Sequence, residues 1–305
     1  MANISYITFL EERINLLEKG GRHGTALTYR KAKSSLSAFL KNRDLKFSRF
    51  DAALVEDYNF WLLCRGVKRN TISFYNRILR AVYNKGVKRG FAVQCFPFRD
   101  AYTGVDRTRK RCVGCDILRE LKALSLNGDK ALILARDIFL FGIYARGMAF
   151  VDMAFLRKCN VKGGVLKYIR RKTGQEMTVR IESPMTEILK RYAGEGEYLF
   201  PVMTPESPFL KQRCPAEDEH LRYSRILSAY NYRLRRLSEM LDVDCRLTSY
   251  TGRHTWASLA RKMKVPLSVI SEGMGHTSER TTEIYLASLD MAEIDRANRK
   301  ILASI

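Results

Sequence analysis

Apolar residues in the first ninety positions recur at steps of three and four, and this spacing restricts the region to amphipathic helices. The pattern predicts helices over 3–19, 25–40 and 51–64, and a fourth that begins at Asn70, a residue type common at N-caps. Helices with one apolar stripe bury that stripe against each other. We therefore expect residues 1–95 to form a small all-helical domain with basic outer faces.

The helical pattern breaks over residues 96–111, which contain Pro97, Gly104 and a run of basic side chains. This composition is typical of an interdomain linker, and a solvated loop inside one domain is the alternative. Residues 112–305 then mix two periods. Short alternating stretches over 159–182 predict a β-hairpin or small meander, and helices are expected at 116–125, 130–144, 222–241, 251–263, 266–273, 279–288 and 290–303. The expected fold is mainly α with a small β-sheet: a helical N-terminal domain, then a mixed α+β domain that ends in a tail helix.

The charge of the chain favours a polyanionic partner. The 54 Lys and Arg residues exceed the 32 Asp and Glu residues, so the formal net charge is +22. Such an excess is typical of nucleic-acid-binding proteins, although some basic housekeeping proteins share it. We find no apolar run of about 18 residues and no secretory signal, and therefore expect a cytoplasmic protein with no membrane contact. The lone Cys112-x-x-Cys115 pair is interpreted as coincidence, and neither a metal nor a cofactor is expected.

Two segments near the C-terminus combine residue types suited to phosphodiester chemistry. Residues 253–257 read Arg-His-Thr-Trp-Ala, and residues 275–285 read Gly-His-Thr-Ser-Glu-Arg-Thr-Thr-Glu-Ile-Tyr. Breaking a DNA phosphodiester without a metal requires a nucleophile, an acid for the leaving group, and cations around the phosphoryl oxygens. Tyrosine provides a nucleophile, arginine binds phosphate as a bidentate fork, and lysine can donate a proton.

These segments resemble the tyrosine site-specific recombinases of the phage integrase type. That family has an Arg-His-Thr-aromatic-Ala segment that opens a helix, and a Gly-His pair whose histidine precedes a tyrosine by nine residues, as His276 precedes Tyr285. The family layout is a SAM-like helical domain, a linker and a mixed catalytic domain. The resemblance implies integration, excision or inversion of DNA through a 3′-phosphotyrosine intermediate. A type IB topoisomerase-like enzyme and a non-catalytic DNA-binding regulator are the alternatives.

The resemblance also implies roles for individual residues. It makes Tyr285 the nucleophile, Arg253 a ligand of the scissile phosphate, and His276 a hydrogen-bond partner of the phosphate or the nucleophile. Lys172, on the expected hairpin, matches the general acid of the family. Arg171 is the alternative at that position, but an arginine does not give up its proton. Outside this context, Tyr285 would be interpreted as a packed helical tyrosine.

One departure from the family pattern lies three residues before Arg253. The family has a histidine where this chain has Tyr250. A phenol can still donate one hydrogen bond to a phosphoryl oxygen, but it does not titrate near neutral pH. His254 is adjacent, yet helix geometry turns it about 100° away from Arg253, and we interpret it as structural.

The other departure concerns the first arginine of the family, which stands three residues before an acidic residue. Ala149 occupies that position relative to Asp152. The nearest arginine is Arg146, and an out-of-register arrangement of this kind resembles the integrases of mobile conjugative elements. We expect Arg146 to take the role. If the segment is helical, positions 146 and 149 are also one turn apart, so the long side chain of Arg146 could reach the place of a residue at 149. Arg136 and Arg157 are the alternatives.

Contacts with DNA outside the catalytic residues are expected from polar and basic positions on the second and fourth helices and in the linker. These positions are Thr28, Lys31, Lys33, Thr71, Ser73, Arg77, Arg109 and Arg111. The expected partners are double-stranded DNA with a specific recombination site, other copies of the chain on that DNA, and accessory DNA-bending proteins. Such a protein would be associated with the nucleoid.

Overall fold

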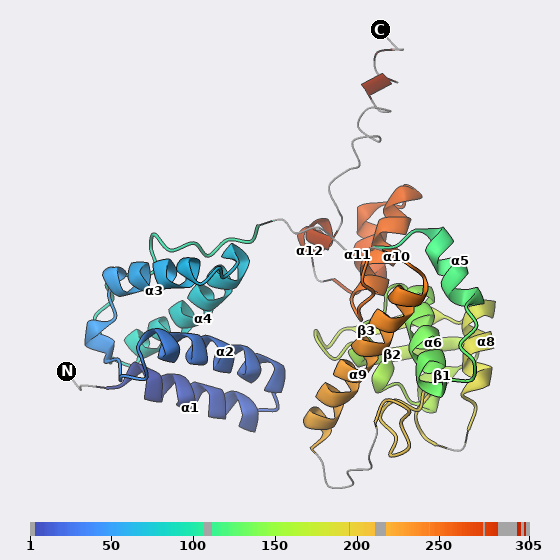
Figure 1. Ribbon diagram of the computed structural model, residues 1–305, viewed down its shortest axis with the longest axis horizontal. Coiled ribbons are helices and arrows are strands. Elements are labelled where there is room, and N and C mark those ends of the chain that lie inside the picture. Colours follow the sequence, from blue (N-terminus) through green and yellow to red (C-terminus); the bar gives the residue numbers. More distant parts are fainter. Residues whose placement is uncertain are drawn as a thin grey trace. The chain divides into compact units, whose positions relative to one another are not determined.

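The computed structural model divides the chain into two compact units, Met1–Thr108 and Arg109–Ile305 (Figure 1). It describes residues 4–106, 112–194, 196–210, 218–243, 245–276 and 278–285, together with 298–299 and 302. Both units are largely helical, and one small sheet lies in the second. The predicted fold class, mainly α with a small β-sheet, is confirmed.

The described residues of the first unit form four α-helices and one short 3-10 helix. The helices are α1 (Tyr6–Lys19), α2 (His23–Phe39), α3 (Ala52–Cys64) and α4 (Arg69–Lys88), and the 3-10 helix η1 spans Phe47–Arg49. Side-chain caps set two of the starts, because Ser5 accepts a hydrogen bond from the backbone of Thr8 and Asp51 accepts one from Leu54. The core includes an aromatic cluster of buried side chains, which contains Tyr6, Phe9, Phe47, Phe50 and Tyr83.

The end of the first unit returns along α4. Asn70 donates to the carbonyl of Asp106 (3.0 Å) and accepts from its backbone N–H (2.7 Å), while Asn76 donates to the carbonyl of Tyr102 (3.2 Å). The hydroxyl of Ser73 donates to the carbonyl of Gly104 between them. The prediction of Asn70 as an N-cap is wrong: the helix begins at Arg69, and the Asn70 side chain instead binds the segment that we interpreted as linker. Three side chains at helical spacing thus match alternate carbonyls of an extended chain.

The second unit contains eight α-helices in the part of the chain that the structure describes. They are α5 (Cys115–Ala123), α6 (Lys130–Tyr144), α7 (Phe150–Ala154), α8 (Ser183–Arg191), α9 (Glu219–Met240), α10 (Thr251–Lys262), α11 (Leu267–Gly273) and α12 (Glu279–Tyr285), with the 3-10 helix η2 at Lys158–Asn160. The pattern did not predict α7 or α8. The helix predicted over 290–303 falls almost entirely outside the described residues.

The sheet of the second unit is a three-stranded antiparallel meander. Its strands are β1 (Val161–Lys162), β2 (Val165–Ile169) and β3 (Glu176–Arg180), in the order β1-β2-β3. Leu166 pairs with Val179, and Tyr168 pairs with Met177. Met177 and Val179 are buried while their neighbours in β3 are exposed, as the period-two pattern predicted.

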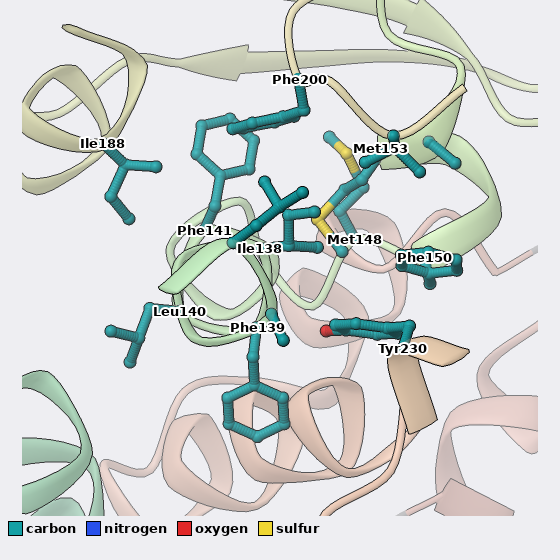
Figure 2. Close-up of a cluster of buried hydrophobic side chains, with 14 of the residues drawn as sticks. Ile138, Phe139, Leu140, Phe141, Met148, Phe150, Met153, Ile188, Phe200 and Tyr230 are labelled. Carbon is teal, nitrogen blue, oxygen red and sulfur yellow. The ribbon is translucent and has the colours of Figure 1, made fainter. Parts of the chain in front are cut away.

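Helix α6 is the centre of the second core (Figure 2). Most of its residues are apolar and buried, and Ile138 and Phe141 are completely buried. A helix of this composition is expected to be surrounded by other elements. Close to it, Phe150 of α7 stacks on Tyr230 of α9, with ring centroids 4.2 Å apart and an angle of 11° between the planes.

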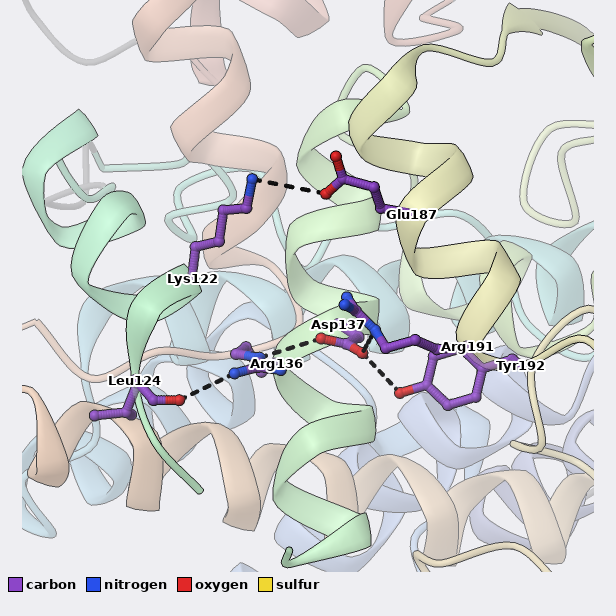
Figure 3. Close-up of polar contacts among 7 residues, drawn as sticks. All are labelled: Lys122, Leu124, Arg136, Asp137, Glu187, Arg191 and Tyr192. Carbon is purple, nitrogen blue, oxygen red and sulfur yellow. Dashed lines mark hydrogen bonds and ion pairs between the residues drawn. The ribbon is translucent and has the colours of Figure 1, made fainter. Parts of the chain in front are cut away.

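A buried carboxylate joins α6 to α8. Asp137 is fully buried and accepts three hydrogen bonds: from Arg136 Nε (3.1 Å), from Arg191 Nε (2.9 Å) and from the Tyr192 hydroxyl (2.9 Å) (Figure 3). Burial, followed by the nearby Asp137 charge, raises the pKa of Tyr192, so this phenol stays a donor. The network holds α8 in place with charge-assisted bonds.

Replacing Asp137 with alanine should lower the free energy of unfolding by about 3 kcal/mol, because the change leaves Arg136 and Tyr192 without a buried acceptor. Urea denaturation followed by circular dichroism would measure the loss. Glu187→Ala is the matched control, since its ion pair with Lys122 is long (3.8 Å) and exposed. The control should lose less than about 1 kcal/mol. Equal losses in the two variants would show that the Asp137 network contributes no more than a surface ion pair.

Candidate active site

Arg253 lies in the first turns of α10 with only 4% of its surface exposed. Its guanidinium donates to two backbone carbonyls, from Nη1 to Gly147 (2.7 Å) and from Nη2 to Met274 (2.5 Å). Gly147 has a φ of 71°, and a Cβ at this position would lie 3.2 Å from the Cα of Arg253. Glycine at 147 therefore permits both the left-handed backbone and the close approach of α10.

Small and hydroxyl residues around Arg253 explain why α10 can be buried at its start. Thr255 is fully buried, and its hydroxyl accepts a hydrogen bond from the backbone of Val113 (3.1 Å). A Cβ at Gly252 would lie only 3.4 Å from Ile143 and 3.5 Å from Phe139, so α10 packs closely on α6 here. The Arg-His-Thr-Trp-Ala segment thus contributes to the packing of α10.

His276 connects Arg253 to α12. Its Nε2 lies 2.9 Å from Arg253 Nη2, and its Nδ1 lies 2.8 Å from the hydroxyl of Thr282, which is fully buried. A guanidinium only donates hydrogen bonds, so Nε2 accepts and Nδ1 carries the proton that is donated to Thr282. Burial, then the charges of Arg253, Arg170 and Lys172, lowers the pKa of His276 to about 4. The imidazole is therefore neutral at physiological pH.

Tyr285 is the last residue of α12, one turn after Thr282. The hydrogen bonds Arg253–His276–Thr282 therefore lead from the buried guanidinium into the helix that carries the predicted nucleophile. The structure describes the backbone of Thr282 and Tyr285 in α12. Of the two side chains, it describes only that of Thr282.

Arg146 lies just beyond α6, in the left-handed region with a φ of 59°. Its side chain is exposed, Nη1 donates to the carbonyl of Thr178 in β3 (3.3 Å), and its Cδ lies 3.8 Å from where a Cβ at Gly273 would stand. The expectation that residues 146 and 149 occupy one helical turn is wrong, because α6 ends at Tyr144 and α7 starts at Phe150. Consecutive left-handed residues at 146 and 147 reverse the chain between the two helices.

Lys172 lies in the turn between β2 and β3, and its side chain is exposed. The turn is closed by two backbone bonds, from Arg170 to Gln175 and from Gly174 to Arg170, each 2.8 Å. The Lys172 charge contributes to lowering the pKa of His276, so the turn is within electrostatic range of that imidazole. Tyr250 is the N-cap residue of α10, and half of its surface is exposed.

The side chain of Arg171, the alternative to Lys172 at the general-acid position, contacts Phe155 and Glu219. Its guanidinium is 3.6 Å from the centroid of the Phe155 ring and forms an ion pair with Glu219 (3.1 Å). The backbone N–H of Arg171 donates to Asp152 Oδ1 (2.9 Å). Burial raises the pKa of Asp152, and this hydrogen bond and the charges of nearby arginines oppose the increase.

Sequence reasoning missed the burial of Arg170. The motifs did not single out this residue, which lies two positions before Lys172, yet only 5% of its surface is exposed and its Nη1 donates to the carbonyl of Gly275. A usable signal was present: Leu166 and Tyr168 alternate with exposed residues along β2, and Arg170, just after the strand, continues this alternation on the inner side.

The residues expected to contact DNA differ in their exposure. Lys31 and Arg77 are exposed, while Thr28, Lys33 and Thr71 are partly buried, and Lys33 forms an ion pair with Glu11. Ser73 is a correction, because it is fully buried and its hydroxyl is bonded to Gly104, which leaves it no access to DNA in this structure. Arg109 and Arg111 lie outside the described residues.

Within the described ranges, no three His, Cys, Asp or Glu side chains group closely enough to hold a metal ion. Of the Cys-x-x-Cys pair, Cys112 is partly buried and Cys115 is exposed at the start of α5. No helix in the described part of the chain combines the length and apolar character needed to cross a membrane.

Comparison with known protein families decides the relationship. The model of the phage integrase family matches residues 136–291, about half of the chain, a range that contains Arg253, His276 and Tyr285. The chain belongs to the phage integrase family. The model of the phage integrase SAM-like domain matches residues 5–98, which cover α1 to α4.

Curated relatives within the phage integrase family are distant. The tyrosine recombinase XerD of Ralstonia nicotianae is 24% identical over 200 residues, which cover 61% of this chain and 62% of that protein. The integrase of Staphylococcus phage L54a is 28% identical over 127 residues, which cover 41% of this chain and 34% of that protein. The chain thus spans between about a third and three fifths of the length of these relatives.

Solved structures in the phage integrase family share the fold. A lambda integrase tetramer bound to a Holliday junction is similar with a TM-score of 0.66 at 12% identity, over 94% of this chain and 78% of the other. The Tn1549 transposon integrase in complex with transposon right end DNA is similar with a TM-score of 0.65 at 13% identity, over 98% of this chain and all of the other.

Proposed function

We propose that this member of the phage integrase family is a tyrosine recombinase that performs site-specific DNA recombination, with Tyr285 as its nucleophile. The hydrogen-bonded path from the buried Arg253 through His276 to Thr282 carries the proposal. This path links a fixed phosphate-binding group to the helix that ends in Tyr285. When a group that binds the phosphate is hydrogen-bonded to the helix that carries the nucleophile, the nucleophile can be held in position to attack the bound phosphodiester.

In the proposed reaction, the Tyr285 oxygen attacks the scissile phosphorus, and the bond from phosphorus to the 5′ oxygen breaks. The products are a 3′-phosphotyrosine and a free 5′ hydroxyl. Attack by the 5′ hydroxyl of another strand reverses the step, releases tyrosine and completes the exchange. The reaction conserves the number of phosphodiester bonds, so it needs neither hydrolysis nor a high-energy cofactor.

The neighbouring side chains take complementary roles in this proposal. Arg253 binds the phosphoryl oxygens with its planar fork. His276 is neutral, so it orients Arg253 and hydrogen-bonds the phosphate or the nucleophile without adding charge. Lys172, on an exposed turn, protonates the leaving 5′ oxygen, which neither Arg171 nor any other guanidinium can do.

Two further residues, one exposed and one half exposed, would contact the DNA. Arg146 is exposed and held to Thr178, and we propose that it contacts a phosphate of the bound DNA. Tyr250 is half exposed at the start of α10 and would donate one hydrogen bond to a phosphoryl oxygen. The net charge of +22 matches a duplex substrate, whose phosphates would release counterions on binding.

The proposed partners are double-stranded DNA with a specific site, further copies of this chain on that DNA, and accessory DNA-bending proteins. A tetramer on a Holliday junction is the assembly recorded for lambda integrase. An enzyme of this kind acts in the cytoplasm on the nucleoid. The same chemistry underlies type IB topoisomerase-like enzymes, and a degenerate recombinase could act as a regulator, so the experiment must separate three outcomes.

The test uses DNA fragments from both flanks of the gene, each nicked near an inverted repeat so that cleavage becomes irreversible. The protein is incubated with each fragment in excess EDTA, and the products are separated on a denaturing gel. A covalent adduct confined to one site, with retained activity in chelator, is the expected result. An adduct at every sequence would indicate a topoisomerase-like enzyme, and binding without an adduct would indicate a regulator.

A further inference from the structure

Arg170 is a second buried guanidinium beside Arg253. It follows the last residue of β2, and it is 5% exposed against 4% for Arg253. Its Nη1 donates to the carbonyl of Gly275, while Arg253 donates to the carbonyl of Met274. Consecutive carbonyls of one turn therefore anchor the two guanidiniums directly before His276.

The turn is placed against the sheet by close packing. Gly275 has a φ of 63°, and a Cβ there would lie 2.7 Å from the sulfur of Met177 in β3. The turn and the hairpin thus form one packed unit, and Arg170 reaches the turn from the strand paired with β3. Both arginines lower the pKa of His276, so both charges are close to that imidazole.

The Arg170 guanidinium is buried, and among the described residues we find no close counterion for it. No carboxylate among the described residues lies within ion-pair distance of its guanidinium, although Asp152 is near enough for the two charges to interact. Its Nε is buried and has no hydrogen-bond partner in the part of the chain that the structure describes. A buried cation that is neither paired nor fully hydrogen-bonded is costly, so its position is best explained by an anion that binds there.

We propose that Arg170 is the second phosphate-binding guanidinium of the site. It would take the role of the family's first arginine, whose position in this chain is occupied by Ala149. The inference rests on the proposed recombinase function. Arg146 is the nearer candidate in sequence, but it is exposed and bonded to Thr178, whereas Arg170 is buried with Arg253 on one turn. Two guanidiniums on one phosphate would divide its two non-bridging oxygens between them.

The experiment compares Arg170→Ala, Arg170→Lys and the wild type on two nicked substrates. One has an ordinary scissile phosphate, and the other has a methylphosphonate, in which a methyl group replaces one charged oxygen. Arg180→Ala is the matched control, because Arg180 is an exposed arginine at the end of β3. The rate of adduct formation is measured, together with DNA affinity and the thermal unfolding midpoint.

Arg170→Ala should lose roughly 100-fold or more in cleavage of the phosphate and less than about 10-fold with the methylphosphonate, because the neutral substrate needs one cation fewer. Arg170→Lys should fall between Arg170→Ala and the wild type, and Arg180→Ala should match the wild type. Equal losses on both substrates would mean that Arg170 only supports the turn, and this result overturns the inference even if the variant is partly unfolded. Wild-type rates in Arg170→Ala would overturn it as well. Absence of an adduct with the wild type would instead refute the proposed function.

Discussion

Replacing Tyr285 with phenylalanine is expected to abolish the covalent adduct with a nicked site. The change removes only the phenolic oxygen and preserves the aromatic ring. Loss of a nucleophile that no neighbour can replace should reduce cleavage by at least about 1,000-fold. DNA affinity should stay within about twofold, because the charges that hold the duplex are untouched.

The measurement pairs a denaturing gel for the adduct with a mobility-shift assay for binding. Tyr232→Phe provides the control, since Tyr232 is a half-exposed tyrosine of α9 outside the proposed site. It should behave as the wild type in both assays. An adduct that persists in Tyr285→Phe would assign the nucleophile to another residue, and a parallel loss of binding would point to a structural role.

Arg253→Lys and Arg253→Ala form the second pair with a large expected effect. Each variant should lose about 100-fold or more in cleavage, because a fixed cation that stabilises a developing oxyanion typically contributes that much. Lysine keeps the charge but lacks the planar guanidinium. It therefore cannot donate to the carbonyls of Gly147 and Met274 and also hydrogen-bond His276. The lysine variant should therefore recover only a small part of the activity.

Adduct formation at saturating DNA concentration isolates this effect from binding. Lys262→Ala is a suitable control, because Lys262 is an exposed cation in the last turn of the same helix. Because Arg253 is buried, unfolding curves should accompany the rates. Activity close to wild type in a folded Arg253→Ala protein would exclude this residue as the phosphate ligand.

Most helices could be predicted from the sequence because the local spacing of apolar residues identifies the face that each helix buries. Over α1 to α6 the predicted and observed limits differ by a few residues, and α10 and α11 match almost as well. The two helices that were missed are short. Of these, α7 is a single turn of five residues, and α8 starts at Ser183-Pro184 directly after a strand. Five residues make fewer than two turns, so α7 is too short for apolar spacing to repeat, whereas α8 has nine residues, as many as α5, and its length does not explain why it was missed.

The candidate site could be predicted only in part. Arg253, His276 and Tyr285 are recognisable because they are embedded in compact motifs with constant spacing. Arg146 was chosen as the nearest arginine to position 149, and the structure shows that the two positions are not on one helical turn, because the left-handed pair at 146 and 147 follows the end of α6. The roles predicted for Asn70 and Ser73 were also wrong, because both side chains hydrogen-bond an extended segment some thirty residues further along the chain.

The sequence by itself determined the helical character of both units, the position of the sheet and the residue types of the chemistry, because periodicity and motif spacing are local properties. Only the tertiary structure decided which cationic side chains lie close together. Arg170 and Arg253 are 83 positions apart in the chain, yet they donate to adjacent carbonyls of one turn. That meeting depends on the close contacts of Gly147 with α10 and of Gly275 with β3, and such contacts are set by packing between elements.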